Sequence, residues 1–91
     1  MEIQIEENEE QGYYFIEQDG ARAAEMEFRR RADRLIIVHT GVNEGYEGKG
    51  YGKMLVEKAI ADAREGKYAI VPVCKFARKY FDKHPEAADV L

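Results

Sequence analysis

The sequence predicts an α+β fold in which an antiparallel β-meander is followed by a glycine-rich turn, one crossover helix, a parallel strand and a short C-terminal helix. Three observations support this prediction. Strand-like segments fill the first half of the chain, five glycines crowd residues 41–52, and apolar residues recur at helical spacing from residue 51. With 91 residues, the chain has the length of one domain, so we expect residues 1–91 to form a single unit.

The meander is predicted from four short segments. Ile3 and Ile5 alternate with polar residues, residues 13–17 are rich in aromatic and β-branched side chains, and Asp19-Gly20 is a hairpin signal. Residues 35–38 form an apolar run typical of a strand buried on both faces. In residues 21–30, alternation predicts two faces, with Arg22, Ala24, Met26 and Phe28 on one and Ala23, Glu25 and Glu27 on the other.

The second half of the chain predicts two helices and one strand. Tyr51, Leu55, Ala59 and Ala63 are each four residues apart, which predicts a helix that stops near Gly66. Residues 68–71 predict a buried strand ended by Pro72. Residues 75–83 predict a short amphipathic helix ended by the His-Pro pair at 84–85.

Composition argues against several classes of function. A net charge of −4 disfavours general nucleic-acid binding, which depends on neutralising phosphates. No stretch reaches the roughly 20 apolar residues of a membrane span, and the first residues lack the pattern of a signal peptide. A single cysteine, Cys74, excludes an internal disulfide and favours a cytoplasmic protein. Two distant histidines and one cysteine do not have the spacing of a metal site.

The glycine-rich turn, Glu-Gly-Lys-Gly-Tyr-Gly at residues 47–52, lies between a predicted strand and a predicted helix. Free N–H groups and the helix dipole favour an anion there, and glycine lets the backbone approach a phosphate closely. The spacing fits neither the Walker loop nor the dinucleotide fingerprint. The residues therefore predict a phosphate-bearing ligand, with a simple connecting loop as the alternative.

The turn and the residues around it resemble the acyl-CoA site of the GNAT acetyltransferase superfamily. Gly50 and Gly52 match its glycine positions, and the apolar spacing of the following helix also matches. Residues 39–42 (His-Thr-Gly-Val), 63–65, 71–74 (Val-Pro-Val-Cys) and 84–86 are similar to the short, single-domain YjdJ-type branch. One position departs: Glu47 stands where the superfamily has Gln or Arg, which opposes pyrophosphate binding unless Lys49 and Lys53 offset it.

The resemblance implies a single-domain GNAT-like fold in which the strand ending at residues 38–40 splays from the strand at 68–71. It implies acetyl-CoA as co-substrate, with its pyrophosphate on the backbone of Gly48, Lys49, Gly50, Tyr51, Gly52 and Lys53. Its pantetheine arm would lie along Thr40, Gly41 and Val42, whose backbone donors would polarise the thioester. The implied reaction is direct attack by a primary amine, from a small molecule or a protein.

Two residues are candidates for acid–base roles. Cys74 lies near the expected position of the sulfur and could donate a proton to the departing thiolate or carry the acetyl group itself, with packing as the alternative. His39 suits a general base, with a structural role as the alternative. Tyr80 is one residue short of the tyrosine position of many GNAT enzymes, which is Phe81 here. Three further residues, Glu25, Glu27 and His84, are more typical of solvated or helix-ending positions.

Two other functions stay open. The first is a module that binds acyl-CoA or CoA without transfer, which Glu47 favours. The second is a protein-interaction domain that has lost the cofactor, and this predicts no stabilisation by CoA at all. The basic C-terminal segment is either a solvated face or steers a charged ligand; its residues are Lys75, Arg78, Lys79 and Lys83.

Overall fold

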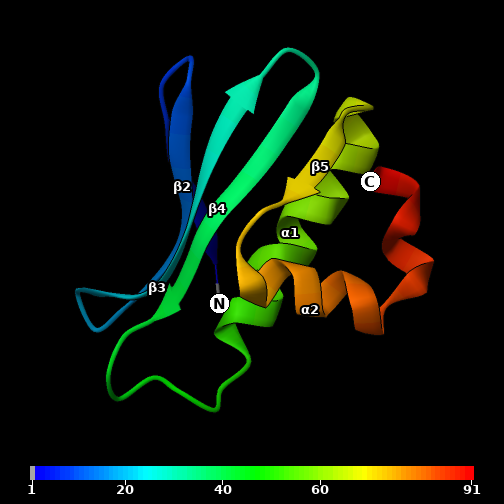
Figure 1. Ribbon diagram of the computed structural model, residues 1–91. Helices are drawn as coiled ribbons and strands as arrows, with labels where there is room; N and C mark the ends of the chain where they lie inside the picture. The colour runs from blue at the N-terminus through cyan, green and yellow to red at the C-terminus, as the bar shows by residue number, and fades with distance from the viewer. Residues whose placement is uncertain (1) are drawn as a thin grey trace.

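A computed structural model describes residues 2–91 as one five-stranded sheet with two α-helices and a terminal 3-10 helix (Figure 1). The order of elements confirms the predicted α+β arrangement. Their bounds are β1 Ile3–Glu7, β2 Gln11–Gln18, β3 Ala21–Arg31, β4 Arg34–Val42, α1 Tyr51–Gly66, β5 Ala69–Pro72, α2 Lys75–Lys83 and η1 Pro85–Val90. The sequence patterns did not predict the 3-10 helix η1.

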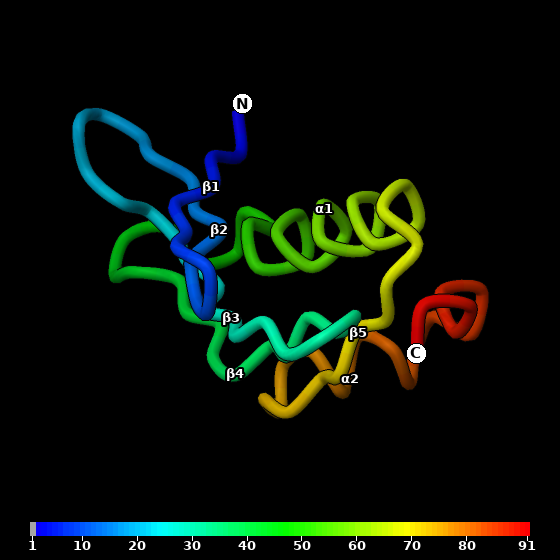
Figure 2. Tube along the Cα trace, turned by 90° about the horizontal axis from the view of Figure 1, so that it is seen from above, coloured from blue at the N-terminus to red at the C-terminus, as the bar shows by residue number. Residues whose placement is uncertain are grey.

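Strands β1 to β4 are antiparallel neighbours, and β5 joins β4 in parallel from the pair Arg34–Ala69 to the pair Ile37–Pro72. The predicted crossover helix, α1, connects β4 to β5 and lies over one side of the sheet (Figure 2). Helix α2 follows β5 and packs against both α1 and β4. The sheet therefore carries its long helix on one side, and β4 and β5 are the only parallel pair among the described strands.

The core forms between α1 and the facing side of the sheet. Tyr14 on β2 and Phe28 on β3 meet edge to face, with ring centroids 5.4 Å apart. The buried Tyr14 hydroxyl donates to Asp62 of α1 at 2.8 Å, so its polar atom is satisfied. The largest fully buried side chains are Tyr14, Phe28, Ile16, Met26, Leu35, Ile37, Leu55, Ile70 and Val56.

The predicted face of Arg22 is wrong because β3 contains a β-bulge. The β2–β3 register steps from Ile16–Ala24 to Glu17–Arg22, which leaves Ala23 without a partner. Ala23 and Ala24 are both buried, and the alternation of faces restarts beyond the bulge. Arg22 therefore lies on the side away from α1, with its guanidinium 3.9 Å from the centroid of Phe15.

The prediction that residues 35–38 are buried on both faces is also wrong. Leu35 and Ile37 are fully buried in the core, whereas Ile36 and Val38 are only half-buried. The reason is that α1 covers the face shared by Leu35 and Ile37, and Ile36 points to the other one. A second bulge, at the step from Glu27–His39 to Phe28–Ile37, leaves Val38 without a partner.

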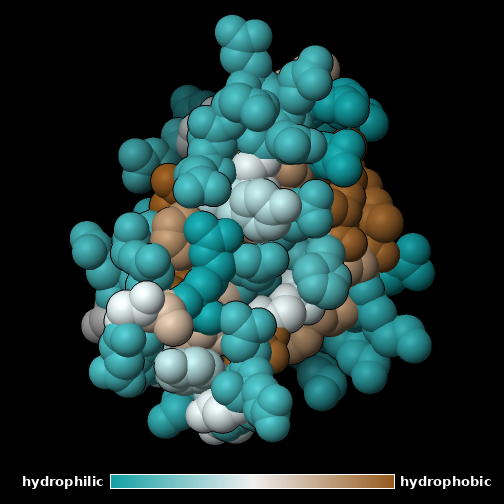
Figure 3. Space-filling model, turned by 90° about the vertical axis from the view of Figure 1, so that its left-hand side faces the viewer, coloured by the Kyte–Doolittle hydropathy of each residue, from teal (hydrophilic) through white to brown (hydrophobic). Residues whose placement is uncertain are grey.

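Hydrophilic side chains dominate the surface seen from the side of β2, and apolar ones gather toward one edge of that view (Figure 3). Along residues 2–91, no helix combines the length and apolar character needed to cross a membrane.

Candidate functional site

The glycine-rich turn leaves the start of α1 open for an anion. Gly50 is the N-cap, in the left-handed region at φ 78° and ψ 18°, and no side chain accepts a hydrogen bond there. The first turn of α1 contains no acidic residue. The N–H groups of this turn and the positive end of the helix dipole thus have no side-chain cap, which leaves them available to an anion.

Glycine is needed in this turn for backbone conformation. Gly48 and Gly50 have φ values of 79° and 78°, a backbone conformation that residues with a side chain rarely adopt. A Cβ at either position would meet nothing within 4 Å, so the surface beside them is free. Gly52 differs, since a Cβ there would lie 2.7 Å from Cζ of Phe76 and would displace that ring.

The side chain of Glu47 is folded back into the loop. Its Oε1 accepts a hydrogen bond from the N–H of Gly45 at 2.9 Å. It therefore does not cap α1, although its exposed charge remains close to the turn. Lys49 and Lys53 are exposed at the turn and at the start of α1, where they can offset this charge.

Beside the turn, β4 and β5 separate. Their pairing ends at Ile37–Pro72, while β4 continues to Val42 and leads into the glycine-rich loop. Asn43 donates its N–H to the carbonyl of Ala23, and bonded pairs alternate along an antiparallel ladder. The backbone groups of Thr40 and Val42 therefore point away from β3, toward the side where β5 has ended. They are hydrogen-bonding groups available to a ligand between the strands.

Cys74 stands where the two strands separate. The N–H groups of Val73 and Cys74 both approach the Ile37 carbonyl, at 3.0 and 3.1 Å. The sulfur is the N-cap acceptor of α2, taking a hydrogen bond from the N–H of Ala77 at 3.4 Å. It also lies 3.4 Å from the hydroxyl oxygen of Thr40. The structure thus brings the predicted residues Thr40 and Cys74 together, and it gives Cys74 a structural role as well.

His39 lies on the other face of β4. Its cross-strand partner is Glu27, while Gly41 is opposite Glu25, so the histidine and both glutamates share one face. His39 is exposed, and the carboxylates are paired with arginines: Glu25 with Arg22 at 3.1 Å and Glu27 with Arg29 at 3.7 Å. Because neighbouring residues of a strand alternate, His39 and Thr40 point to opposite sides, and His39 is not brought together with Cys74.

Tyr80 and His84 are held by other contacts. The Tyr80 hydroxyl donates to Glu57 of α1 at 3.0 Å, and its ring stacks on His84 at 4.1 Å. Burial and the hydrogen bond to Glu57 raise the pKa of Tyr80 to about 12, so it is a poor acid. Nδ1 of His84 lies 2.8 Å from Glu86. These contacts join α2 to α1 and η1, so neither side chain is positioned as a free proton donor.

A small cavity of about 200 Å³ adjoins the start of α1. Three lysines and two aromatic side chains line it: Lys53, Phe76, Lys79, Tyr80 and Lys83. The sequence predicts an amphipathic helix over residues 75–83 and a basic segment within it, but it does not identify Phe76 as a site residue. The spacing of the lining residues along α2 was the available signal, because residues 76, 79, 80 and 83 fall on one side of a helix.

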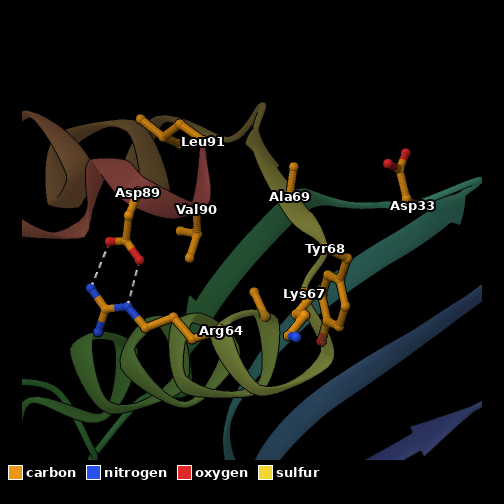
Figure 4. A pocket seen from close by; sticks show the side chains of 9 residues that line it. Asp33, Arg64, Lys67, Tyr68, Ala69, Asp89, Val90 and Leu91 are labelled. Carbon is orange, nitrogen blue, oxygen red and sulfur yellow. Dashed lines mark hydrogen bonds and ion pairs between the residues drawn. The ribbon is translucent and has the colours of Figure 1, made fainter.

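A larger cavity, about 500 Å³, lies at the other end of α1. Figure 4 shows its lining residues, among them Arg64 and Asp89, which form two hydrogen bonds at 2.9 and 2.8 Å. It contains none of the predicted site residues. Within residues 2–91, no three His, Cys, Asp or Glu side chains are grouped to hold a metal ion.

The comparisons with known proteins agree with this geometry. The family model described as GCN5-related N-acetyl-transferase matches residues 13–90. The chain belongs to this GNAT family. Its fold is similar to that of a GCN5-like protein from Staphylococcus aureus, proposed to be an N-acetyltransferase and solved by NMR. The two are 31% identical, with a TM-score of 0.69 over 96% of this chain and 85% of the other.

A second GNAT structure shares the fold at lower identity. It is the ribosomal-protein-alanine N-acetyltransferase from Brucella melitensis biovar Abortus 2308, 18% identical with a TM-score of 0.69. The match covers 84% of this chain and 62% of that one. The search of curated proteins found no match.

Proposed function

We propose that this GNAT chain transfers an acetyl group from acetyl-CoA to a primary amine. The observation that carries the proposal is that β4 separates from β5 beside a helix N-terminus that has no side-chain cap. One end of the sheet thus offers a wedge for an extended arm and a site for a phosphate.

The described residues fit acetyl-CoA in three ways. The α1 start has no acidic residue in its first turn, the surface beside Gly48 and Gly50 is free, and β4 runs past the end of β5. Backbone N–H groups would hold the pyrophosphate, from Gly48, Lys49, Gly50, Tyr51, Gly52 and Lys53. The backbone of Thr40, Gly41 and Val42 would hold the arm between the strands.

The co-substrate supplies an activated thioester carbonyl when bound. The N–H groups of Thr40 and Val42 point into the wedge and would donate to oxygen as negative charge develops there. The Cys74 thiol lies 3.4 Å from the Thr40 hydroxyl and would supply a proton at the leaving sulfur. No covalent acyl-enzyme step is required if the amine attacks directly.

The amine would approach from the face that carries His39, Glu25 and Glu27. His39 is exposed there and would accept the proton that the amine loses. The two glutamates favour a cationic acceptor, small or protein-borne. Arg29, the partner of Glu27, is at the surface, where such pairs are weak, so a substrate cation can compete with it.

A second candidate is binding of acyl-CoA or CoA without transfer. It is favoured by one observation: the two most plausible acids are already engaged. Cys74 caps α2, and Tyr80 donates to Glu57. In that case the wedge and the turn would have the same ligand, but no amine would be acetylated.

The test is an NMR titration of the chain with acetyl-CoA, followed by turnover assays. We expect amide shifts at residues 48–53 and 39–42, and release of free CoA thiol when amines are added. Shifts without thiol release across a broad amine panel would support the binding module. No shifts even with a large excess of acetyl-CoA would overturn both functions.

A further inference from the structure

Four side chains form a line across the side of the sheet that faces away from α1. Glu6 on β1 is opposite Tyr13 on β2. Tyr13 is opposite Glu27 on β3, which in turn is opposite His39 on β4. Cross-strand partners share a face, and Tyr14, the neighbour of Tyr13, is in the core, so all four lie on the outer side. We call these four residues the acidic row; it begins at His39, where the proposed acceptor amine loses its proton.

The far end of the acidic row adjoins a cavity of about 270 Å³ at the β1–β2 hairpin. Its lining contains two carboxylates and no lysine or arginine: Glu6, Glu7, Asn8, Gln11, Gly12 and Tyr13. Glu7 is occupied, since Arg30 donates two hydrogen bonds to it, at 3.3 and 3.2 Å. Glu6 is 68% exposed, and its one ion-pair contact within residues 2–91 is Arg22 at 3.8 Å, beyond hydrogen-bond distance. A second cation can therefore bind to Glu6.

The ring of Tyr13, between the two carboxylates of the row, is a surface that attracts a cation. The guanidinium of Arg22 lies 5.7 Å from its centroid, which shows that a cation fits beside this ring. Arg22 is held mainly elsewhere, by Glu25 at 3.1 Å and over the ring of Phe15 at 3.9 Å. Glu27 has a similarly distant partner, Arg29 at 3.7 Å. The row thus offers two carboxylates and an aromatic ring that their present cations contact only loosely.

The length of the row indicates the shape of the acceptor. Neighbouring strands are about 4.8 Å apart, so roughly 14 Å separate the backbones of His39 and Glu6, which lie on β4 and β1. A flexible chain with an amine at each end can span that distance. The strands between them, β2 and β3, are paired on both sides, so their backbone has no hydrogen bonds to offer a peptide laid over the row. These features favour a small linear acceptor over a peptide.

We propose that Glu6 and Tyr13 select a linear diamine as the acceptor of the acetyl group. One amine, in its neutral form, would attack the thioester carbon and pass its proton to His39 as the thiolate leaves. The other would stay charged beside Glu6, with the methylene chain along the ring of Tyr13. This inference rests on the proposed function, because it requires the reacting amine to lie at His39.

The test measures release of CoA thiol from acetyl-CoA by the full chain with three amines. Diaminodecane can span the row, decylamine has the same length but no far ammonium, and diaminobutane is too short to reach Glu6. We expect the KM of diaminodecane to be about fivefold below that of decylamine, since its far ammonium gains an exposed ion pair and a cation–π contact. The difference should shrink at high salt, because screening weakens exposed charges.

The outcomes separate this inference from the proposed function. Equal KM values for diaminodecane and decylamine would overturn the inference alone, because thiol release would still support the transfer. No thiol release with any of the amines would overturn both. A higher kcat/KM for a basic peptide that contains lysine than for diaminodecane would overturn the choice of a small acceptor.

Two variants assign the effect to the row. Glu6→Gln should raise the KM of diaminodecane about threefold and leave kcat and the KM of diaminobutane unchanged. Tyr13→Leu should also raise the KM of diaminodecane about threefold, since the cation–π contact is lost. The matched control is Glu65→Gln, which changes the net charge equally at an exposed position of α1, on the other side of the sheet. A rise in KM that is the same for diaminodecane and decylamine in Glu6→Gln would overturn the assignment.

Discussion

The hydroxyl oxygen of Thr40 lies 3.4 Å from the sulfur of Cys74, across the point where β4 and β5 separate. The same sulfur accepts the N–H of Ala77 and begins α2. The thiol is therefore positioned from two sides, by the end of a strand and by the start of a helix. A substitution at Cys74 has to be interpreted for both roles.

Stability measurements on two substitutions test the capping role of Cys74. Cys74→Ala removes the N-cap acceptor, so we expect a loss of about 1 kcal/mol in unfolding free energy. For a chain of this size that lowers the melting temperature by about 4–8 °C. Cys74→Ser should keep or improve stability, because oxygen accepts the same hydrogen bond. Equal destabilisation by Ser and Ala would show that the sulfur does not cap α2.

Glu47→Gln should strengthen acetyl-CoA binding by about twofold to fivefold, because one exposed charge is removed beside the pyrophosphate site. Glutamine keeps an oxygen that can accept the Gly45 N–H, so the loop should be unchanged. The measurement is calorimetry at low and high salt. Glu44→Gln, at an exposed position of the same loop, is the control. An identical gain in both variants would indicate a general effect of net charge.

Tyr14→Phe should change how stability depends on alkaline pH. Burial, helped by the hydrogen bond to Asp62, raises the pKa of Tyr14 far above its usual value. In the unfolded chain the Tyr14 hydroxyl ionises near pH 10. The stability that the folded chain gains by keeping this hydroxyl protonated is therefore complete below about pH 10 and is lost as pH rises further. The pKa of Tyr80 is also raised, to about 12, so Tyr80 adds to the loss of stability at alkaline pH.

We therefore expect the variant to lose about 1 kcal/mol at neutral pH, where the hydrogen bond is missing. Above about pH 10 its stability should fall less steeply than that of the parent chain, by up to about 1.4 kcal/mol per pH unit. Denaturant unfolding at neutral and alkaline pH measures both effects. Tyr13→Phe, on the other face of β2, is the control, and parallel alkaline curves for Tyr14→Phe and the parent chain would contradict the prediction.

His39→Gln should lower turnover about 100-fold if this residue is the general base, and acetyl-CoA affinity should remain as it was. His84→Gln replaces the other histidine, which contacts Glu86 and Tyr80, and should keep the turnover of the parent chain. Unchanged turnover in His39→Gln would assign the proton transfer elsewhere, with Glu27 as the next residue to test.

Local patterns predicted the elements well, because strand alternation and helical spacing are properties of neighbouring residues. They could not reveal the bulges at Ala23 and Val38, which depend on the partner strand. For that reason Arg22 was expected on the wrong face. The glycine spacing and the helix start did predict the turn at residues 47–52, since both are local in sequence; phosphate binding by this turn stays a prediction.

Contacts between distant segments were beyond sequence reasoning. Thr40 and Cys74 are 34 positions apart, and local patterns do not indicate that they meet; only the resemblance to the GNAT superfamily implied that both lie near the thioester. The bond from Tyr80 to Glu57, which engages the hydroxyl, spans 23 positions. The cavity lined by Phe76 contains residues of both α1 and α2, so it could not be predicted before the two helices were placed next to each other.

The strands lie in the sheet in the order in which they occur in the chain. Each antiparallel pair can therefore form through a short turn, and only β5 has to wait for a long connection through α1. Pairing of neighbouring strands through short turns closes only short loops, so we expect the brief β4–β5 pairing to assemble after the meander. The wedge thus lies beside the shortest pairing in the described sheet, and we expect native-state hydrogen exchange to be faster there than between β2, β3 and β4. The opening between β4 and β5 is thus a consequence of strand order, because the one strand that returns through a helix pairs only briefly with its neighbour.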